Sequence, residues 1–360
     1  MIQPVPHIAV MAPYALAQLD APAGKRLISL SQNESLRPPS PQVAPAVAGA
    51  LGAAHLYPDP DWVDLRQGLS ALHGIPADGI LCGQGSMELI AGLMRVFAGP
   101  GATVLAPAHA YPFFRTAAAL AGARFDSAPE RDGRVCVEAL LHAVQADTRV
   151  VCVANPGNPT STRIPRADLI RLRAALREDI LLIVDEAYGE FADHLGEPVF
   201  DLVAGGNAVV LRSFSKAYGL AGLRVGWGLF PVQIVREMRK VLTPNNVALA
   251  GQAAAAAALA DQTYMRDTCR LTGDLRTGFA GDLRRVGLNV PESFTNFVLI
   301  GFPDGAAARG ADEALRREGV ILRPQAGVGL ETCLRATIGA KADLDIAADI
   351  LRHWAKGQMT

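Results

Sequence analysis

Short, strongly apolar runs alternate with amphipathic segments through the middle of the chain. Runs of strand length occur at 80–82, 103–106, 149–154, 180–184 and 208–211. The segments between them, whose apolar residues recur at helical spacing, include 86–97, 114–120 and 169–176. Uninterrupted apolar strands separated by helices are typical of a parallel sheet that is covered on both faces. The pattern from about 80 to 230 therefore predicts an α/β domain with a mostly parallel central sheet.

The chain after Pro244 follows a different pattern. Helical spacing dominates as far as Val286, and three short apolar runs then follow at 296–300, 319–323 and 333–338. A last helical segment covers residues 343–354. Short strands mixed with helices predict a smaller α+β domain at the C-terminal end.

The N-terminal segment predicts an arm rather than a domain. A short helix is expected near residues 8–19, and three prolines at 38, 39 and 41 then interrupt regular structure. We therefore divide the chain into an arm, a large domain and a small domain, with boundaries at 1–40, 41–245 and 246–360.

Composition and charge exclude several classes of partner. The 360 residues are half hydrophobic, and 34 basic against 35 acidic residues leave a net charge of −1. No basic block favours nucleic acid, and five scattered cysteines lack metal-ligand spacing and indicate reduced thiols. The start of the chain lacks the pattern of a signal peptide, and no apolar helix is long enough to cross a bilayer. We expect a cytoplasmic protein that binds neither metal nor membrane.

The segment from Asn207 to Gly228 carries the first candidate chemistry. A strand-like run ends here in Ser213-Phe214-Ser215-Lys216, and Arg224 follows. Lys216, placed just after a buried strand, would be partly desolvated, and desolvation favours the neutral amine that a Schiff-base lysine needs. The hydroxyl groups and Arg224 suit a phosphate. The alternative is a surface loop with solvated Lys and Arg, because Ser-x-x-Lys alone is a weak motif.

A glycine-rich turn at 83–88 opens a predicted helix. Free backbone N–H groups and the helix dipole at this N-terminus would favour an anion. The alternative is an ordinary capping turn with Ser86 as the N-cap.

Polar residues also follow the other buried strands, where open α/β sheets bind ligands. Asp185, directly after a buried strand, needs a cationic partner, and a protonated pyridine nitrogen is one. Tyr188 and Asn158 could donate hydrogen bonds to a phenolate oxygen, and Tyr111 could stack on an aromatic ring. Together with Lys216, these residues predict a site for pyridoxal 5'-phosphate, which needs a Schiff-base lysine and an acid at its ring nitrogen.

Six motifs occur in a fixed order along the chain. They are Tyr-Pro-Asp-Pro (57–60), Gly-x-Gly-Ser (83–86), Asn-Pro-Gly-Asn-Pro-Thr (155–160), Asp-Glu-Ala-Tyr (185–188), Ser-Phe-Ser-Lys (213–216) and Gly-Leu-Arg-x-Gly (222–226). With these motifs the chain resembles the fold-type I aminotransferases of class I and II over nearly its whole length, and most closely the histidinol-phosphate aminotransferase branch. The resemblance implies a pyridoxal-phosphate-dependent enzyme that transfers an amino group to a 2-oxo acid and works as a homodimer.

The resemblance also implies roles for individual residues. Lys216 would form the Schiff base and then move a proton, Asp185 would keep the ring nitrogen protonated, and Tyr188 would act beside them. Tyr57 would reach the phosphate in the neighbouring subunit. The residues implied in cofactor binding are Tyr57, Gly85, Ser86, Met87, Tyr111, Asn158, Asp185, Tyr188, Ser213, Ser215, Lys216 and Arg224.

The substrate side is implied by the arm and by two arginines. Arg335 resembles the arginine that binds the acidic group of the substrate, and Arg323 resembles an additional phosphate contact. The alternative for Arg323 is a surface ion pair, but two arginines suit a dianion. The residues implied in substrate binding are Tyr14, Asn33, Glu34, Asn158, Arg323 and Arg335.

Three positions depart from the branch. Met87 replaces an acidic or small residue, Ser35-Leu36 replaces Asn-Pro in the arm, and Ser161 replaces glycine. None of them touches the predicted lysine or acid, so the chemistry is less affected than the choice of substrate.

Other functions stay open at this point. The same fold would suit an aminotransferase for aromatic or other amino acids, a decarboxylase of the threonine-phosphate type, or a non-catalytic pyridoxal-phosphate-binding protein. A nicotinamide dehydrogenase or a P-loop enzyme lacks its glycine motif here, and the seven histidines show no zinc-site clustering.

Overall fold

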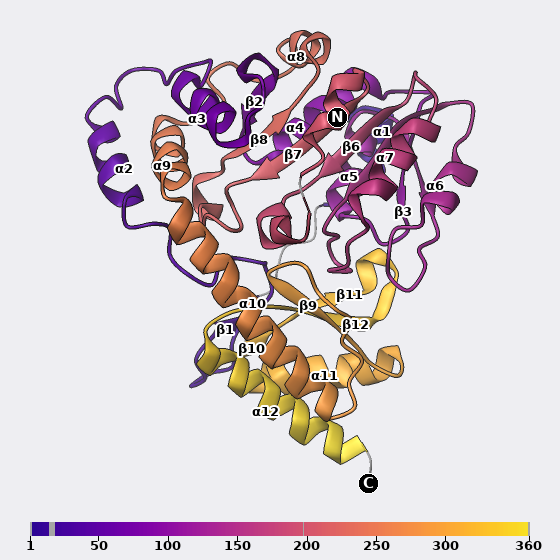
Figure 1. Cartoon of the computed structure of the whole chain (residues 1–360). Helices are drawn as coiled ribbons and strands as arrows, with labels where there is room; N and C mark the ends of the chain where they lie inside the picture. Colours follow the sequence, from indigo (N-terminus) through magenta and orange to yellow (C-terminus); the bar gives the residue numbers. More distant parts are fainter. Residues whose placement is uncertain (1, 14–18, 197, 359–360) are drawn as a thin grey trace.

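The computed structural model describes residues 2–13, 19–196 and 198–358. Within these ranges the buried apolar side chains form a larger and a smaller hydrophobic core. Figure 1 shows the larger body, which holds the main sheet, above the smaller body with the C-terminal helix.

The larger body is built on a mixed sheet whose strands run mostly parallel. In the described part of the chain this sheet has seven strands in the order β2-β8-β7-β6-β5-β3-β4, and only β8 runs antiparallel to its neighbours. The strands are β2 (Ile80–Gly83), β3 (Thr103–Pro107), β4 (Arg124–Ala128), β5 (Thr148–Ala154), β6 (Leu181–Asp185), β7 (Ala208–Ser213) and β8 (Gly226–Leu229). The prediction of a mostly parallel α/β sheet is confirmed.

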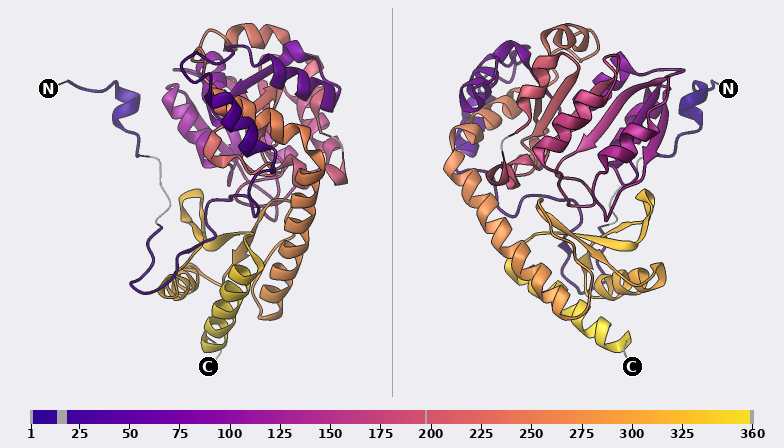
Figure 2. Two further views of the ribbon diagram at one scale, coloured as in Figure 1. Left: turned by 90° about the vertical axis from the view of Figure 1, so that its left-hand side faces the viewer. Right: turned by 45° about the vertical axis from the view of Figure 1, so that its right-hand side comes forward.

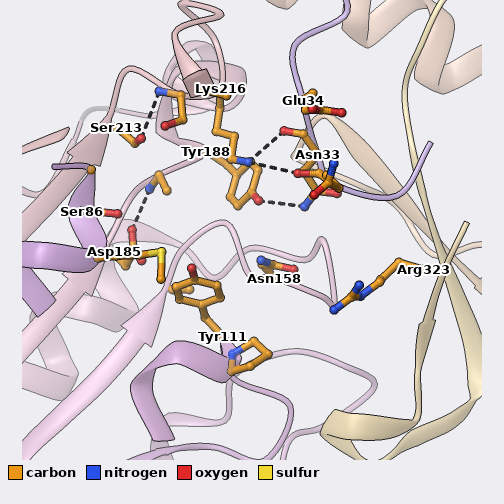
Figure 3. Close-up of a pocket in the computed structure, with 18 of the residues that line it drawn as sticks. Asn33, Glu34, Ser86, Tyr111, Asn158, Asp185, Tyr188, Ser213, Lys216 and Arg323 are labelled. Atoms are coloured by element: carbon orange, nitrogen blue, oxygen red, sulfur yellow. Dashed lines mark hydrogen bonds between the residues drawn. The ribbon is translucent and has the colours of Figure 1, made fainter. Parts of the chain in front are cut away.

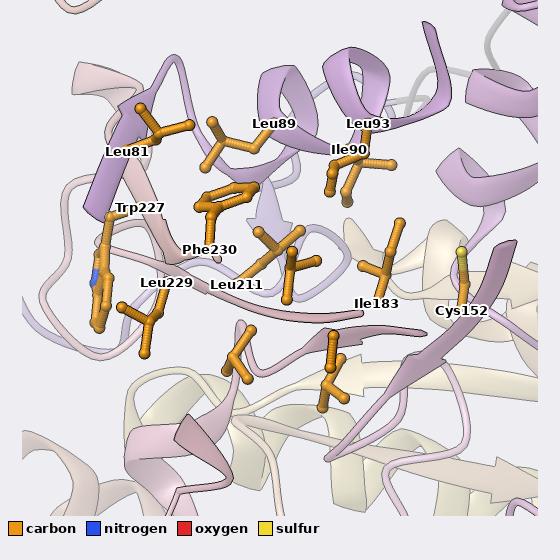
Figure 4. Close-up of a cluster of buried hydrophobic side chains, with 14 of the residues drawn as sticks. Leu81, Leu89, Ile90, Leu93, Cys152, Ile183, Leu211, Trp227, Leu229 and Phe230 are labelled. Carbon is orange, nitrogen blue, oxygen red and sulfur yellow. The ribbon is translucent and has the colours of Figure 1, made fainter. Parts of the chain in front are cut away.

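Burial on both faces explains the uninterrupted apolar runs. Cys152, Ile183 and Leu211, from three neighbouring strands, are completely buried. Figure 4 shows Leu89, Ile90 and Leu93 of a covering helix and Phe230 in the same cluster. A strand without a solvent-facing side has no polar positions to alternate with apolar ones.

Helices pack around this sheet and leave the carboxyl ends of β5, β6 and β7 facing the smaller body. The helices of the larger body are α2 (Val43–Leu51), α3 (Val63–His73), α4 (Ser86–Phe97), α5 (Pro112–Leu120), α6 (Val137–Ala143), α7 (Arg166–Ala175), α8 (Val232–Met238) and α9 (Leu249–Ala260). Two strands of the sheet were not predicted. β4 is a polar edge strand, and β8 contains two glycines, so neither carries the apolar signal on which the prediction depended.

The smaller body contains a three-stranded antiparallel sheet in the order β11-β12-β9. Its strands are β9 (Phe297–Gly301), β11 (Arg323–Gln325) and β12 (Leu330–Thr337), and its helices are α11 (Gly305–Arg317) and α12 (Lys341–Gln358). The arm adds β1 (Ile28–Ser29), which pairs in parallel with β10 (Val320–Ile321). The predicted α+β character is confirmed.

The predicted N-terminal helix at 8–19 is wrong in the part that the structure describes. Helix α1 covers only Pro6–Ala9, and Met11 to Pro13 are not helical. A proline disfavours helical backbone at the preceding residue, so Pro13 limits the helix on its C-terminal side. In Figure 2 this segment lies apart from the smaller body.

One helix, α10 (Gln262–Arg285), runs from the larger core to the smaller one (Figure 2). Met265 near its start belongs to the larger core, whereas Phe279 and Leu283 near its end belong to the smaller core. The domain boundary at 245/246 stays a prediction, and we propose that the division lies within α10, because α9 still packs in the larger core. No helix among the described residues is long and apolar enough to cross a membrane.

Candidate active site

A cavity of about 510 Å³ lies where the carboxyl ends of the parallel strands face the smaller body. Figure 3 shows side chains from both bodies and from the arm converging on it. The predicted residues that line it are Asn33, Glu34, Gly85, Ser86, Met87, Tyr111, Asn158, Asp185, Tyr188, Ser213, Ser215, Lys216, Arg224, Arg323 and Arg335.

Lys216 extends into this cavity from the turn after β7. Its Nζ donates to the backbone oxygen of Asn33 at 2.9 Å and lies 3.5 Å from that of Gln32. Burial, together with repulsion from Arg335 and Arg224, lowers the pKa of Lys216 to about 7. The lysine is therefore poised between ammonium and neutral amine near neutral pH, as its position after a buried strand predicts.

Asp185 ends β6 and is almost completely buried. Its Oδ1 accepts a hydrogen bond of 3.0 Å from the backbone N–H of Ala187. Among the described residues it forms no salt bridge, and burial raises its pKa to about 7. A buried carboxyl group at a cavity wall with this pKa suits a cationic ligand atom, which would compensate the cost of burying the charge.

Two further side chains that line the cavity, Asn158 and Tyr188, carry hydrogen-bond donors. Asn158 Oδ1 accepts from Arg335 Nη1 at 2.6 Å, so its amide nitrogen is left to donate. The hydroxyl oxygen of Tyr188, which also lines the cavity, accepts a hydrogen bond from Asn33 Nδ2 at 2.8 Å (Figure 3). Both groups therefore suit an acceptor oxygen on a ligand, as the sequence predicts.

An anion cradle lies at the start of α4. Gly85, at φ +76°, is the N-cap of this helix, so Ser86 is the first helical residue rather than the cap. A Cβ at Gly85 would stand 2.7 Å from Arg224 Nη2. The close approach of Arg224 to the free N–H groups of a helix N-terminus makes a site for a phosphate.

Two serines complete the cradle. The backbone N–H of Ser215 donates to Ser213 Oγ at 3.1 Å, and Arg224 Nη1 lies 3.4 Å from Ser215 Oγ. Gly226 also matters here, because a Cβ at that position would stand 2.3 Å from the Ser86 nitrogen. The residues present therefore fit pyridoxal phosphate: a phosphate cradle, a buried acid, phenolate donors and a lysine surround one cavity.

Tyr111 lines another part of the cavity wall. It is the N-cap residue of α5, and its ring packs edge-on against Phe114 with the centroids 5.7 Å apart. Its ring lines the cavity, as a stacking role requires.

The smaller body contributes the two arginines. Arg323 on β11 and Arg335 on β12 are direct partners in the antiparallel register, so they lie side by side. Arg335 Nη2 also donates to the Ser31 backbone oxygen at 2.8 Å, which ties it to the arm. Paired guanidinium groups at a cavity wall suit an anionic group with two charges.

Among the described residues, one predicted residue, Tyr57, is not brought to the cavity. Tyr57 is 88% exposed and does not line the cavity of its own chain, as expected if its target lies in a second subunit. Tyr14 lies outside the described residues. The roles of all the predicted site residues stay predictions.

Several residues near the cavity were not predicted. Gln32 and Ser31 contribute backbone oxygens, which leave no mark in a sequence. Buried Asn296 donates to the backbone oxygens of Asn33 and Glu34 at 3.1 and 2.9 Å and holds the arm in place. An asparagine at the first position of an otherwise apolar predicted strand was the available signal for this contact.

Comparisons with known proteins agree with this geometry. The family model for aminotransferase class I and II matches residues 25–351. A histidinol-phosphate aminotransferase of Jannaschia sp. is 39% identical over 342 residues, with 95% of each chain covered. One of Rhodospirillum centenum is 38% identical over 359 residues, covering 98% of this chain and 99% of the relative.

The solved structures include one with very similar architecture. The crystal structure of a histidinol-phosphate aminotransferase from Sinorhizobium meliloti, in complex with pyridoxal-5'-phosphate, superposes with a TM-score of 0.93. It is 30% identical, with 99% of each chain covered. Since the family model spans most of the chain and the relatives match it almost end to end, the chain belongs to the class I and II aminotransferase family.

Proposed function

We propose that this aminotransferase takes L-histidinol phosphate as its amino donor and a 2-oxo acid as its acceptor. The observation that carries the proposal is the register pair of Arg323 and Arg335, both of which line the cavity that holds Lys216. A phosphate monoester has up to two negative charges, which two guanidinium groups match better than one. The names of the similar proteins from three bacteria support the same donor.

Pyridoxal phosphate, when bound, supplies an aldehyde carbon for the amino group and a ring that withdraws electrons from the donor's α-carbon. The protein holds it with the cradle of Gly85, Ser86, Ser213 and Arg224. Because the pKa of Lys216 is about 7, much of this amine is neutral at physiological pH and can accept a proton from that α-carbon.

The other site residues would orient the cofactor and stabilise its charges. Asp185, ionised beside the ring nitrogen, would hold a proton there. Tyr188 and Asn158 would donate to the phenolate oxygen, and the Tyr111 ring would keep the cofactor plane fixed. Arg335 links the two ends of the site, since its guanidinium contacts Asn158 at 2.6 Å.

The proposal includes a homodimer with shared sites. Tyr57 is exposed and follows Leu56, another exposed apolar side chain on the same loop. In a dimer this loop would carry Tyr57 to the phosphate in the second subunit. We also propose a cytoplasmic location, in keeping with five free cysteines.

The test is a donor comparison with purified protein loaded with pyridoxal phosphate. L-Histidinol phosphate should convert the enzyme to its amino form, as followed by the loss of visible absorbance, more efficiently than phenylalanine or aspartate. Arg323→Ala should lower kcat/KM for histidinol phosphate by about 10- to 100-fold, the loss of one charged hydrogen-bonding group. Efficient conversion by an amino acid but not by histidinol phosphate would exclude this donor, and release of CO₂ would indicate a decarboxylase.

A further inference from the structure

We infer that His109 is a positioning residue that fastens the phosphate-binding strand of the smaller body to the larger body. The segment from Arg323 through η6 (Ala326–Val328) to Leu330 is called here the arginine hairpin. The His109 Nδ1 atom lies 2.8 Å from the backbone oxygen of Val328 at the tip of this hairpin. A carbonyl oxygen only accepts, so Nδ1 carries the proton and donates it.

The histidine is itself well anchored on the larger body. It lies between β3 and α5, two residues before Tyr111. Its backbone N–H donates to Glu130 Oε1 at 3.0 Å, and the preceding N–H of Ala108 donates to the Ala128 oxygen at 2.8 Å. Two bonds to the end of β4 and the residues after it therefore fix the loop from which the imidazole projects.

The hairpin is held to β12 by a short and irregular ladder. Its first strand has three residues, and the ladder to β12 is irregular between Pro324 and Gln325. The turn closes with the Gly329 N–H donating to the Ala326 oxygen at 3.0 Å, and Gly329 adopts φ +74°. The His109 ring lies against this glycine, with its Nδ1 and Cε1 atoms 3.7 Å from where a Cβ would stand.

This contact links the two walls of the cavity. Arg323 and Gln325 line the cavity from the hairpin, and Tyr111 lines it from the loop of His109. The Gln325 amide donates to the Arg323 oxygen at 2.8 Å, so the two residues move together. A hairpin that is free of His109 would hold Arg323 less rigidly in its position opposite Arg335.

The kinetic expectation rests on the proposed function. The phosphate of the donor keeps its charge throughout the reaction, so its contact to Arg323 contributes equally to ground-state and transition-state binding. Removing the fastening with His109→Leu should therefore raise KM for L-histidinol phosphate about five- to tenfold and change kcat less than about twofold. His109→Asn keeps an N–H donor near the Nδ1 position and should restore KM to within about twofold of the wild-type value.

A matched control exists on the surface. The His353 Nδ1 atom also contacts a backbone oxygen, that of Asp349 at 2.7 Å, but within its own helix α12. His353→Leu therefore removes the same kind of contact without separating the two bodies, and should leave both constants unchanged.

Hydrogen–deuterium exchange of the cofactor-loaded protein tests the fastening without turnover. Amides of residues 326–330 should exchange at least about fivefold faster in His109→Leu, and at the wild-type rate in His109→Asn and His353→Leu. Unchanged exchange in His109→Leu would overturn the inference. So would a loss of kcat of about five- to tenfold with KM unaltered. If the wild-type enzyme rejects histidinol phosphate, the proposed donor fails, and the exchange rates alone decide whether His109 fastens the hairpin.

Discussion

At the scale of single residues, two side chains occupy positions that cost free energy. Lys216 is held among backbone oxygens and positive charges that lower its pKa to about 7. Ser161 occupies the left-handed region at φ +61° and is completely buried. The lowered pKa of Lys216 serves the proposed chemistry, whereas nothing in the structure shows a use for the left-handed backbone of Ser161.

We predict that Ser161→Gly stabilises the protein by about 1 kcal/mol. Glycine avoids the left-handed strain of about 1–2 kcal/mol and removes a buried hydroxyl that has no hydrogen-bond partner among the described residues. It loses about 0.5–1 kcal/mol through the freer unfolded chain. The backbone bonds to Gly157 and Phe294 do not depend on the side chain. A shift of the urea midpoint measures the effect, and Ser161→Ala separates the hydroxyl from the strain. A lower midpoint for Ser161→Gly would contradict the prediction.

We predict that capture of pyridoxal phosphate by the cofactor-free protein speeds up as pH rises through about 7. Below that pH the amine of Lys216 is protonated and unreactive, and above it the amine is neutral. Arg335 is the largest charge that lowers this pKa, so Arg335→Leu should move the midpoint of the rate profile to higher pH. Stopped-flow absorbance measures the rate. Arg323→Leu is the control and should leave the midpoint in place, and an unmoved midpoint in Arg335→Leu would refute the assignment.

At the scale of elements, a buried charge cluster joins β7 to the segment after β6. The Arg212 guanidinium donates to Glu186 at 2.9 Å and to Asp193 at 2.7 Å, and lies 3.4 Å from Glu190. Burial raises the pKa of Glu190 to about 7. Asp185 and Ser213 are the immediate neighbours of Glu186 and Arg212. The charge cluster therefore fixes the ends of β6 and β7, which form part of the site, relative to each other.

We predict that Arg212→Met lowers the stability by about 3–5 kcal/mol at pH 8, because it leaves buried carboxylates without a cation. The loss should be smaller at pH 5.5, where Glu186 and Glu190 can take up protons and avoid the buried charge. Denaturant unfolding at the two pH values measures both effects. Arg352→Met, which removes a surface ion pair with Asp349, should cost less than about 0.5 kcal/mol. An equal loss at both pH values would argue against the carboxylates as the cause.

The elements also differ in how well the sequence predicted them and the site residues that they carry. Asp185 and Lys216 were found because each follows an apolar run, and parallel strands bring their carboxyl ends to one edge. β8 escaped prediction because its glycines make room for Leu211 and for the turn at Ser86, a packing requirement without local periodicity. The contact from Lys216 to the arm escaped because it uses a backbone oxygen 183 residues away, which any residue type supplies.

At the scale of the whole molecule, family and fold follow from the order of the motifs, and the subunit arrangement does not. Tyr57 is exposed in the single chain, and its predicted target is a phosphate in a second chain. The exposure of Tyr57 is compatible with this predicted role if the loop around residue 57 lies between two subunits, as we propose.

We predict that mixing two inactive or weakened variants restores one good site per dimer. Lys216→Ala lacks the amine but keeps Tyr57, and Tyr57→Ala keeps the amine but lacks the phosphate contact. In a mixed dimer the site with Lys216 receives its tyrosine from the other chain. Equilibrium titration should then show tight pyridoxal-phosphate binding in about half of the mixed dimers' sites, by the symmetry of a twofold pair. Absence of recovery in a verified mixed dimer would place Tyr57 in its own chain's site or in none.

The pairing of β1 with β10 affects the order in which the two cores can fold during translation. Ile28 pairs with Val320, and the smaller core joins Ile28 to residues as late as Leu351, whereas the larger core needs residues only as far as Phe297. On the ribosome the larger core can form while the smaller one waits for its last helix. Asn33, whose oxygen holds Lys216, is fixed by Asn296 and Thr337. The active site is therefore completed only after Thr337 has been synthesised.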